Sequence, residues 1–400
     1  MNPTRLTDRL ALELYQRGDL HELGAAAHAE CCRRHASSVR TFLIDRNINY
    51  TNICRTRCRF CAFSTDAEAS GAYVLGRDEL LDKVAELQAA GGTQVLLQGG
   101  MHPGLSLEWY VQMLADIRSA FPKIHLHAFS PPEIWFFHEH YALSVPAVLD
   151  RLRQAGLDSI PGGGAEILVD RVRREISPRK CTADQWLEVM RQAHAMGMMT
   201  TATMMFGHVE RPVERIEHLR RLRELQDRSL DAGKGRFTAF ICWTFQPGHT
   251  ELGSLVQSGS FLKPVGRVSR RPGLRPPEPE AAEAEAATVR SDIPDDADDL
   301  HVEGELRLAG SVTYLRTLAL ARLYLDNFDN LQASWVTQGP KIGQLALFYG
   351  ANDMGGIMME ENVVSAAGTT FRMTADEVRR LIRDAGYQPR QRDCYYNLVD

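Results

Sequence analysis

Three cysteines, Cys54, Cys58 and Cys61, lie close together in the stretch NICRTRCRFCAF. Thiolates are soft ligands that suit zinc and iron–sulfur clusters, and a structural zinc site would need a fourth ligand. No fourth cysteine follows nearby, although a distant one could fold back to supply it: Cys181, Cys242 or Cys394. A cube cluster held by only three thiolates leaves one iron open to a small molecule. Phe60 precedes the third cysteine, where an aromatic ring would pack beside that molecule.

Composition indicates an ordinary globular protein and excludes several other classes. The chain has 400 residues, a net charge of −5 and 44% hydrophobic residues, so nothing points to a nucleic-acid surface. No apolar run approaches the roughly 18 residues of a membrane helix, and the N-terminus reads as an amphipathic helix and not as a signal peptide. The eight cysteines are therefore expected to be reduced thiols in a cytoplasmic protein that binds neither nucleic acid nor membrane.

Strand-like runs alternate with helix-like stretches along most of the chain. The runs are 39–52, 93–100, 124–132, 157–166, 200–210, 237–248, 331–340 and 350–358. Helices are expected near 106–121, 144–155, 167–174 and 212–227. This alternation predicts a parallel sheet in an α/β protein, and about eight units suit a TIM-type (β/α) barrel. A doubly wound open sheet is the structural alternative.

Four segments follow from the pattern. Residues 1–40 are expected to form an N-terminal helical extension and 41–253 the first part of the barrel. The segment 254–309 begins rich in Arg and Pro and becomes rich in Ala, Glu and Asp, so we expect a mostly disordered acidic insertion. Residues 310–400 would complete the barrel and add C-terminal helices.

Polar residues and glycines follow the predicted strands, at the end of a barrel where active sites lie. Gly99 and Gly100 end the second run, and paired glycines let a ligand approach the backbone closely. SIPGGGAE ends the fourth run with Glu166, which could accept hydrogen bonds from a ribose or simply favour a helix N-terminus. His125 and His127 are two residues apart on one strand, so they share a face and are candidates for substrate contact or proton transfer in the lumen.

Further candidates for catalysis or substrate binding lie at the same predicted end of the barrel. They are His102, Glu133, His208, Gln246, Thr337 and Gln338. An uncharged polar rim with aromatic residues suits a sugar joined to an aromatic ring, although each of these residues could equally belong to the core or to a turn.

The three-cysteine motif, inside the barrel pattern, resembles the radical S-adenosylmethionine (SAM) superfamily. The resemblance implies that the cysteines hold a 4Fe–4S cluster and that SAM chelates the open iron. One-electron cleavage of the sulfonium would then release a 5′-deoxyadenosyl radical. The cofactor contacts implied by the resemblance are Phe60, Gln98, Gly99, Gly100, Glu166, Gly207 and Glu210.

Within the superfamily, the chain resembles the futalosine-pathway cyclases of menaquinone biosynthesis. The stretches that carry this resemblance include DRNINYTNIC, HAFSPPEI, AGLDSIPGGGAEIL, TATMMFGHVE and SWVTQG. The chain departs from that family at Cys242, where proline is expected near the substrate, and in its long acidic insertion. Aminofutalosine synthase, the deazaflavin-forming synthases and a non-catalytic iron–sulfur protein are the alternatives.

The resemblance also implies a reaction and its partners. The substrate would be dehypoxanthine futalosine, which would lose a hydrogen atom from its ribose and close a C–C bond onto its benzoate ring. Because two C–H bonds become one C–C bond, SAM would be consumed as the oxidant to 5′-deoxyadenosine and methionine. A flavodoxin or ferredoxin would donate the electron, and a homodimer is a candidate assembly.

The cysteine assignment generates a direct prediction. Cys54→Ala, Cys58→Ala and Cys61→Ala should each abolish cluster assembly and deoxyadenosine formation, because each removes one of only three thiolates. Iron content, the cluster absorbance and product analysis measure both effects. Full activity in any one of the three variants would contradict the assignment.

Overall fold

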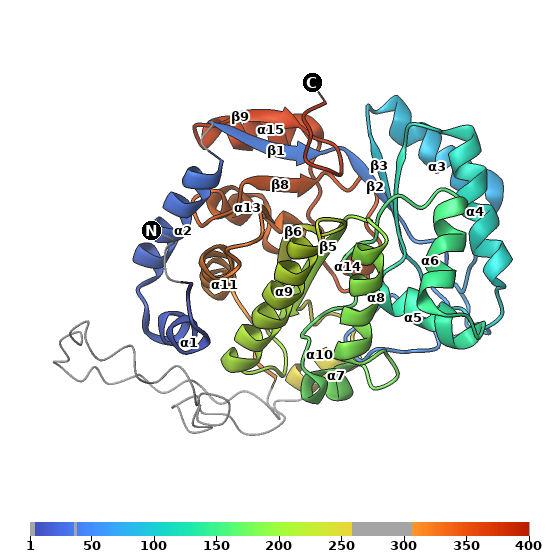
Figure 1. Cartoon of the computed structure of the whole chain (residues 1–400), viewed down its shortest axis with the longest axis horizontal. Helices are drawn as coiled ribbons and strands as arrows, with labels where there is room; N and C mark the ends of the chain where they lie inside the picture. The colour runs from blue at the N-terminus through green and yellow to red at the C-terminus, as the bar shows by residue number, and fades with distance from the viewer. Residues whose placement is uncertain (1–4, 36–37, 258–305, 400) are drawn as a thin grey trace.

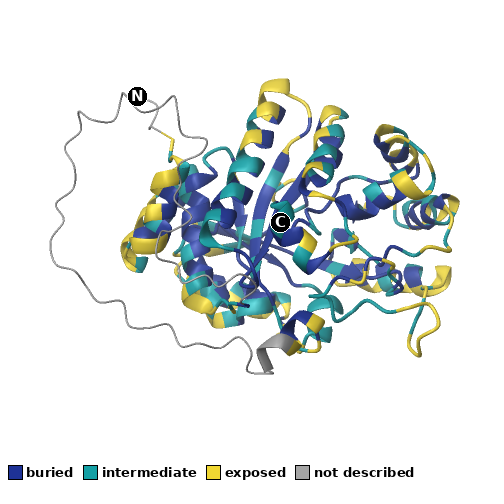
Figure 2. Cartoon of the chain, turned by 90° about the horizontal axis from the view of Figure 1, so that it is seen from below, coloured by how far each residue is buried: buried dark blue, intermediate teal, exposed yellow. Residues whose placement is uncertain are grey.

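The computed structural model describes residues 5–35, 38–257 and 306–399. Parallel strands lie at the centre and helices surround them, as Figure 1 shows. Seen from below, the strands and the inner helix faces are buried, and the exposed residues lie on the outer faces of the helices (Figure 2). No helix in the described part of the chain is long and apolar enough to cross a membrane.

The strands form two sheets in which every named pairing is parallel. The first sheet has the order β5-β6-β7-β8-β1-β9 and the second has the order β2-β3-β4. The strands are β1 (Val39–Leu43), β2 (Asp45–Ile48), β3 (Gln94–Leu97), β4 (His125–Ala128), β5 (Thr200–Phe206), β6 (Phe237–Thr244), β7 (Asn330–Gln332), β8 (Asp353–Gly356) and β9 (Gln388–Gln391). The predicted α/β class with parallel strands is confirmed.

Two features connect the sheets. Residues 39–48 run almost straight from β1 into β2, so one stretch of chain belongs to both sheets. On the far side, isolated parallel bridges pair His127 with Ser159 and Ile160 with Thr200. The run 157–166, predicted as a strand, thus contributes only these two bridges, because its three glycines turn away immediately afterwards. Closure into a single barrel stays a prediction.

Helices follow most strands and cover the sheets. They are α1 (Asp8–Arg17), α2 (Leu20–Arg34), α3 (Arg77–Ala89), α4 (Leu107–Ala120), α5 (Pro131–His140), α6 (Val145–Gln154), α7 (Asp170–Ile176), α8 (Ala183–Ala195), α9 (Pro212–Ala232), α10 (Glu251–Gln257), α11 (Ser311–Tyr324), α12 (Trp335–Gln338), α13 (Pro340–Ala346), α14 (Val363–Ala366) and α15 (Ala375–Asp384). Side-chain caps begin several of them, such as Ser106 at α4 and Thr182 at α8. Of these, α4, α6, α7 and α9 match the helices expected near 106–121, 144–155, 167–174 and 212–227.

The structure adds elements that the pattern missed and corrects one. The helices α3, α5 and α8 and the strand β9 were not predicted. In α5 the run PPEIWFFHEH is apolar on several sides because most of it is buried, so it lacks a clear amphipathic period. The run 331–340 is strand only at its start and then turns into α12, where Gly339 has a positive φ of 82°.

The ends of the chain close the outside of the fold. α1 packs on α9, and α2 packs along α11 (Figure 1). Most of the predicted insertion 254–309 lies outside the described residues. Its described C-terminal end is packed, since Leu306 is buried and the Arg307 N–H donates to the His208 carbonyl at 2.8 Å.

A buried ion pair fastens the C-terminal strand. Arg392, just after β9, donates from Nε and Nη2 to the two carboxylate oxygens of Asp353 in β8, at 2.6 and 2.9 Å. Its guanidinium also lies 3.9 Å from the centre of the Tyr396 ring. Both side chains of the pair are almost fully buried, so each satisfies the other's charge.

This pair should therefore be expensive to break. We expect Arg392→Leu to lower the free energy of unfolding by about 3–5 kcal/mol, because it leaves the Asp353 carboxylate buried without a compensating positive charge, with only the Thr41 hydroxyl and the Gly355 N–H as donors. Urea unfolding measures the change. The control Arg33→Leu removes a pair with Glu30 in which the arginine side chain is 65% exposed, and should change stability by only about 0–1 kcal/mol. Equal effects of the two variants would contradict the assignment.

Candidate active site

A cavity of about 400 Å³ lies between the strands, with the cysteine loop at one end. Cys54, Cys58 and Cys61 all line it, and so does Phe60. The strands supply the walls through side chains two residues apart, as the alternation of strand side chains requires. These wall residues include Asp45, Asn47, Gln94, Leu96, His127, Thr201, Thr203, Ile241, Trp243 and Gln332.

The strand register arranges these side chains in layers. Asp45, Gln94 and His125 are register partners across β2, β3 and β4. Asn47, Leu96 and His127 form the next layer toward the cysteine loop. Amides, hydroxyls and apolar side chains thus alternate through the cavity, and its charged groups sit mainly at its ends.

Hydrogen bonds to three neighbouring segments hold the cysteine loop in place. The Cys54 N–H donates to the Thr65 carbonyl at 3.1 Å, and the Cys61 N–H closes a turn onto the Cys58 carbonyl at 3.0 Å. The Arg55 and Arg59 N–H groups donate to Met101 and Ile176, which lie beyond β3 and at the end of α7. The loop is therefore part of the rigid fold and presents its thiols to the cavity.

Burial also shapes the chemistry of the thiols. Burial raises the pKa of the Cys58 thiol to about 12, an effect that nearby Lys180 opposes. A thiol in this environment does not ionise by itself at neutral pH, so binding of a metal centre must displace its proton.

The glycines near the cavity allow parts of the chain to approach one another. A Cβ on Gly100 would lie 2.1 Å from the Ile53 carbonyl oxygen, and one on Gly163 would lie 2.4 Å from the Gln98 amide nitrogen. Gly100 therefore lets the loop after β3 pass directly against the cysteine loop. The predicted cofactor contacts of Gln98, Gly99 and Gly100 remain predictions, and all three residues line the cavity.

Glu166, which the sequence singled out, forms a buried ion pair with Lys180, which it did not. One carboxylate oxygen accepts from Lys180 Nζ at 2.9 Å, while Oε2 is buried without a hydrogen-bond partner among the described residues. Burial lowers the pKa of Lys180, but the attraction of Glu166 raises it by more. The net shift of the Lys180 pKa is therefore upward, and the amine stays charged. The ammonium lies 5.1 Å from the centre of the Phe60 ring. Glu166 is not in the first turn of α7, which rules out its helix-dipole interpretation.

Glu133 lines the cavity but is saturated by donors from the chain. Oε1 accepts from the Tyr50 hydroxyl at 2.5 Å and the Gly99 N–H at 3.1 Å. Oε2 accepts from the N–H and the hydroxyl of Ser130, which caps α5. Burial raises the pKa of Glu133 although these hydrogen bonds oppose it. Its contacts tie the cysteine loop, β3 and α5 together, and its predicted substrate role has no free oxygen to support it.

The strand histidines do share a face. Both ring systems contact the Ser159 hydroxyl, and His127 lines the cavity while His125 lies behind it. They sit on β4, toward the end of the cavity away from the cysteine loop, because the strand begins at His125. The expectation that they lie near the mouth is therefore wrong.

Several other predicted residues lie outside the cavity. His208 is fully buried, with Nε2 3.0 Å from the Met205 carbonyl oxygen and Nδ1 accepting from the Val209 N–H. Glu210 accepts from the N–H groups of Gly207 and His208 and pairs with Arg215. These bonds keep the turn after β5 in shape. The structure thus gives His208 and the Glu210 carboxylate internal partners, and neither reaches the cavity.

The remaining predicted residues divide between the cavity and its surroundings. Gln246 and Thr337 line the cavity, whereas Gln338 lies behind and donates to the Thr244 hydroxyl at 2.6 Å. His102 accepts from the Gly104 N–H and does not line the cavity. Cys242 is also absent from the lining, because Ile241 and Trp243 face the lumen and the alternate residue points toward Tyr314 of α11. Its expected position near the substrate is wrong.

The floor of the cavity comes from the C-terminal tail, which sequence reasoning missed. Arg392, Cys394 and Tyr396 line it after β9. The only sequence signal of this floor is that the three residues are two positions apart. They lie about 330 residues after the cysteine loop. Cys394 is near His125 and His127 and does not join the three cysteines as a fourth ligand.

The cavity fits the implied cofactors on its donor set. Three thiols face it from one loop, and Cys181 and Cys242 do not line it. Buried oxygen atoms of Asn47, Gln94 and Glu166 lack partners among the described residues and belong to side chains that line the cavity. Such groups are costly unless a ligand or water satisfies them.

Comparisons with known proteins agree with this site. Residues 48–222 match the model of the radical SAM superfamily, and residues 294–400 match the CofH/MqnC C-terminal region. The chain is 39% identical to cyclic dehypoxanthine futalosine synthase of Halalkalibacterium halodurans, over 100% of this chain and 93% of the relative. It is 38% identical to the protein of that name from Streptomyces coelicolor, over 98% and 85%.

Two further relatives set the limits of the comparison. A 5-amino-6-(D-ribitylamino)uracil–L-tyrosine 4-hydroxyphenyl transferase of Methanopyrus kandleri is 37% identical over 90% of this chain and 84% of its own. The crystal structure of methylornithine synthase superposes with a TM-score of 0.65 at 17% identity, covering 96% of this chain and 94% of that one, which supports the fold alone.

The cysteine loop, the parallel sheets and the superfamily match define a radical SAM enzyme, whose cofactors are a 4Fe–4S cluster and SAM. The chain belongs to the futalosine-type family of these enzymes, as its nearly full-length similarity to two members shows. Its substrate is a small molecule.

Asp45 generates a pH-dependent prediction for this cavity. Burial raises the pKa of Asp45 to about 6, which the Met358 N–H only partly offsets. The folded protein then binds more protons than the unfolded chain between about pH 4 and pH 6, so stability falls as pH rises through this window. Asp45→Asn should remove the penalty, and its advantage over the wild type should grow by about 1–2 kcal/mol from pH 5 to pH 7.5.

Urea midpoints at the two pH values measure this difference. The matched control is Asp376→Asn, because the Asp376 side chain is 92% exposed and should give no such trend. An Asp45→Asn advantage that is constant with pH would show that the carboxyl titrates normally.

Proposed function

We propose that this enzyme converts dehypoxanthine futalosine to cyclic dehypoxanthinyl futalosine in the futalosine pathway of menaquinone biosynthesis. The observation that carries the proposal is the similarity to two cyclic dehypoxanthine futalosine synthases over nearly the whole chain, including the tail that forms the cavity floor. The uncharged amides and hydroxyls between the cysteine loop and that floor suit a ribose and a ketone.

The residues of the cavity divide the work. Cys54, Cys58 and Cys61 would hold the cluster, and Glu166 would accept hydrogen bonds from the ribose of SAM through its unpaired oxygen. Lys180, charged beside Glu166 and Phe60, offers a cation to a carboxylate at the same end. When bound, the two cofactors supply one-electron cleavage of a sulfonium, which yields methionine and, after hydrogen abstraction, 5′-deoxyadenosine.

The rest of the chain would orient the substrate and exclude water. Asn47 and Gln94 present unpaired oxygens that would accept hydrogen bonds from sugar hydroxyls. Trp243, Ile241 and Met205 give apolar surface for an aromatic ring and shield reactive carbon centres from other hydrogen donors. The substrate loses one hydrogen atom to SAM-derived carbon, one proton to a base and one electron, so the reaction balances as a two-electron oxidation.

His127 is the proposed proton acceptor for this sequence. It lines the cavity, and burial keeps its pKa well below the usual range, so the imidazole is neutral and able to accept a proton. A small one-electron carrier such as flavodoxin or ferredoxin would supply the reducing electron. The enzyme would act in the cytoplasm, and a homodimer is its proposed assembly.

A second candidate is the hydroxyphenyl transferase of the deazaflavin pathway. It is favoured by the 37% identity over 90% of this chain, close to the values for the cyclases. Aminofutalosine synthase is a third candidate, which would add its adenosyl group to a substrate alkene.

Product analysis separates these candidates. The reduced, cluster-loaded enzyme should convert dehypoxanthine futalosine and SAM to a product lighter by two hydrogen atoms, with one deoxyadenosine and one methionine per turnover. Mass spectrometry measures all three, and Cys54→Ala is the inactive control. A tyrosine-derived adduct of 5-amino-6-(D-ribitylamino)uracil in a parallel incubation, with no cyclised product, would assign the enzyme to the transferases instead. No deoxyadenosine at all would favour a structural cluster.

A further inference from the structure

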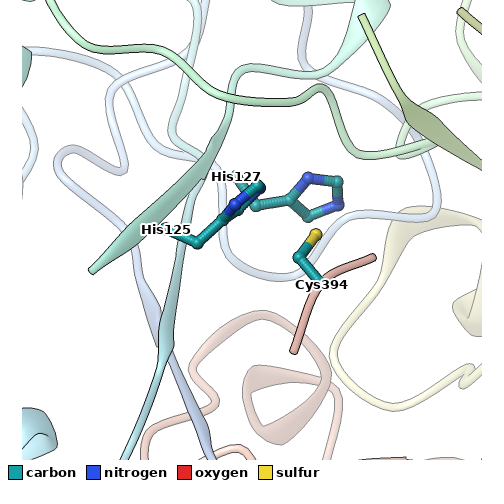
Figure 3. A group of neighbouring side chains, drawn as sticks. All are labelled: His125, His127 and Cys394. Carbon is teal, nitrogen blue, oxygen red and sulfur yellow. The ribbon is translucent and has the colours of Figure 1, made fainter. Parts of the chain in front are cut away.

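Three side chains gather around one hydroxyl at the floor of the cavity. Ser159 Oγ lies 2.6 Å from His125 Nε2, 2.6 Å from His127 Nδ1 and 3.6 Å from Cys394 Sγ. Figure 3 shows both histidines projecting from β4 toward the cysteine of the C-terminal tail. The three contacts thus join β4, the segment after α6 and the tail after β9.

The Ser159 hydroxyl lies between two imidazoles, at the same distance from a ring nitrogen of each. A hydroxyl has one hydrogen to donate and lone pairs to accept with. Facing two ring nitrogens at 2.6 Å, it can donate to one and accept from the N–H of the other. The geometry therefore allows a proton that arrives at one histidine to pass through the hydroxyl to the other without movement of the backbone.

The inner end of this arrangement opens to the cavity. His127 Nδ1 contacts Ser159, while its Nε2 has no hydrogen-bond partner among the described residues, and the residue lines the cavity. Burial lowers the pKa of His127. The neighbouring His125 imidazole and Arg392 guanidinium lower it further. A proton held there is therefore unstable and is readily passed on.

The outer end faces an ion pair, because the Asp158 carboxylate near His125 also binds Arg118. His125 Nδ1 lies 4.0 Å from the Asp158 carboxylate, whose side chain is 31% exposed. Burial lowers the pKa of His125, and Arg118 adds to this, but Asp158 and Asp393 oppose it. The Tyr395 ring covers the edge of the imidazole, with 4.9 Å between centres. A positive charge is thus better tolerated at His125 than at His127.

We propose that His127, Ser159 and His125 form a proton relay that carries the proton released from the substrate to Asp158 and solvent. The inference rests on the proposed function, because a C–H bond must lose its proton after the ring closes. It adds two residues, Ser159 and His125, that act through His127 without touching the substrate.

The transfer balances at each atom. The C–H bond of the substrate ring breaks, its electron pair stays with the substrate, and the proton adds to His127 Nε2. The Nδ1 proton of His127 passes to Ser159 Oγ, whose own proton passes to His125 Nε2. His125 then releases its Nδ1 proton toward Asp158 and water, so the substrate loses one proton and the solvent gains one. The electron that completes the oxidation leaves in a separate step, and the cluster that Cys54, Cys58 and Cys61 would hold would supply its acceptor.

His125, His127 and Cys394 allow a second interpretation as a metal site, since their ligand atoms lie within 4.8 Å of one another. Zinc would need bonds of about 2.0–2.3 Å to each ligand. Ser159 Oγ instead lies among them at hydrogen-bond distance from both imidazoles, which favours the relay.

The test compares Ser159→Ala with Ser229→Ala in the cluster-loaded enzyme. Ser229 is the matched control, because its hydroxyl lies 2.7 Å from His194 Nδ1 in the outer helices. In single turnovers, Ser159→Ala should lower the ratio of cyclised product to deoxyadenosine by about tenfold, below the roughly 10²–10⁴-fold effect of losing a general base entirely. Ser229→Ala should keep the wild-type ratio, and His125→Gln repeats the test if Ser159→Ala does not fold.

A second measurement does not need turnover. Nitrogen-15 NMR of the histidine rings should show that Ser159→Ala changes the tautomer and the apparent pKa of both His125 and His127. An unchanged product ratio together with unchanged histidine signals would overturn the relay. If the wild type does not cyclise dehypoxanthine futalosine, the proposed function fails, and the NMR result alone then decides whether the two imidazoles are linked.

Metal analysis tests the alternative. The purified wild type should carry no metal beyond the iron of the cluster. One equivalent of zinc that is lost in Cys394→Ala and kept in Ser159→Ala would overturn the relay and establish a metal site.

Discussion

The buried ion pair between Arg392 and Asp353 is the contact on which the site most depends. It attaches the residue after β9 to β8, with two hydrogen bonds of 2.6 and 2.9 Å and almost no exposure. β9 itself pairs with the first half of the strand that continues into β2 and the cysteine loop. The ion pair and this strand pairing together link the segment after β9 to the strand that leads to the cysteine loop.

Through this attachment, the C-terminal segment after β9 forms the floor of the cavity. In the turn that follows β9, Arg392, Cys394 and Tyr396 line the cavity, whereas Asp393 and Tyr395 do not. The floor brings a thiol next to the two histidines of β4 and covers their outer edge. A cavity open at this end would admit water, which competes with radical chemistry and leaves proton transfer without a defined path.

Three of the buried polar side chains that lack a partner among the described residues line the cavity. They are Asn47, Gln94 and Glu166, whereas the equally buried carboxylates of Glu133, which also lines the cavity, and Glu210, which does not, are saturated by the chain. A buried carboxylate with four donors stabilises the fold, and one with a free oxygen is prepared for a ligand. This difference separates the structural carboxylates from those available to cofactor or substrate.

The sequence by itself determined that three cysteines share one loop, that the fold is of the parallel α/β class and that His125 and His127 share a face. These features depend on local spacing or on the period of two in a strand, which a sequence records directly. Only the tertiary structure decided that His208 and Cys242 turn away from the cavity and that the C-terminal tail closes it. It also decided that Ser159 sits between the histidines. The reason is physical: direction and distance between segments far apart in the chain are set by packing and strand register, and a single sequence carries neither.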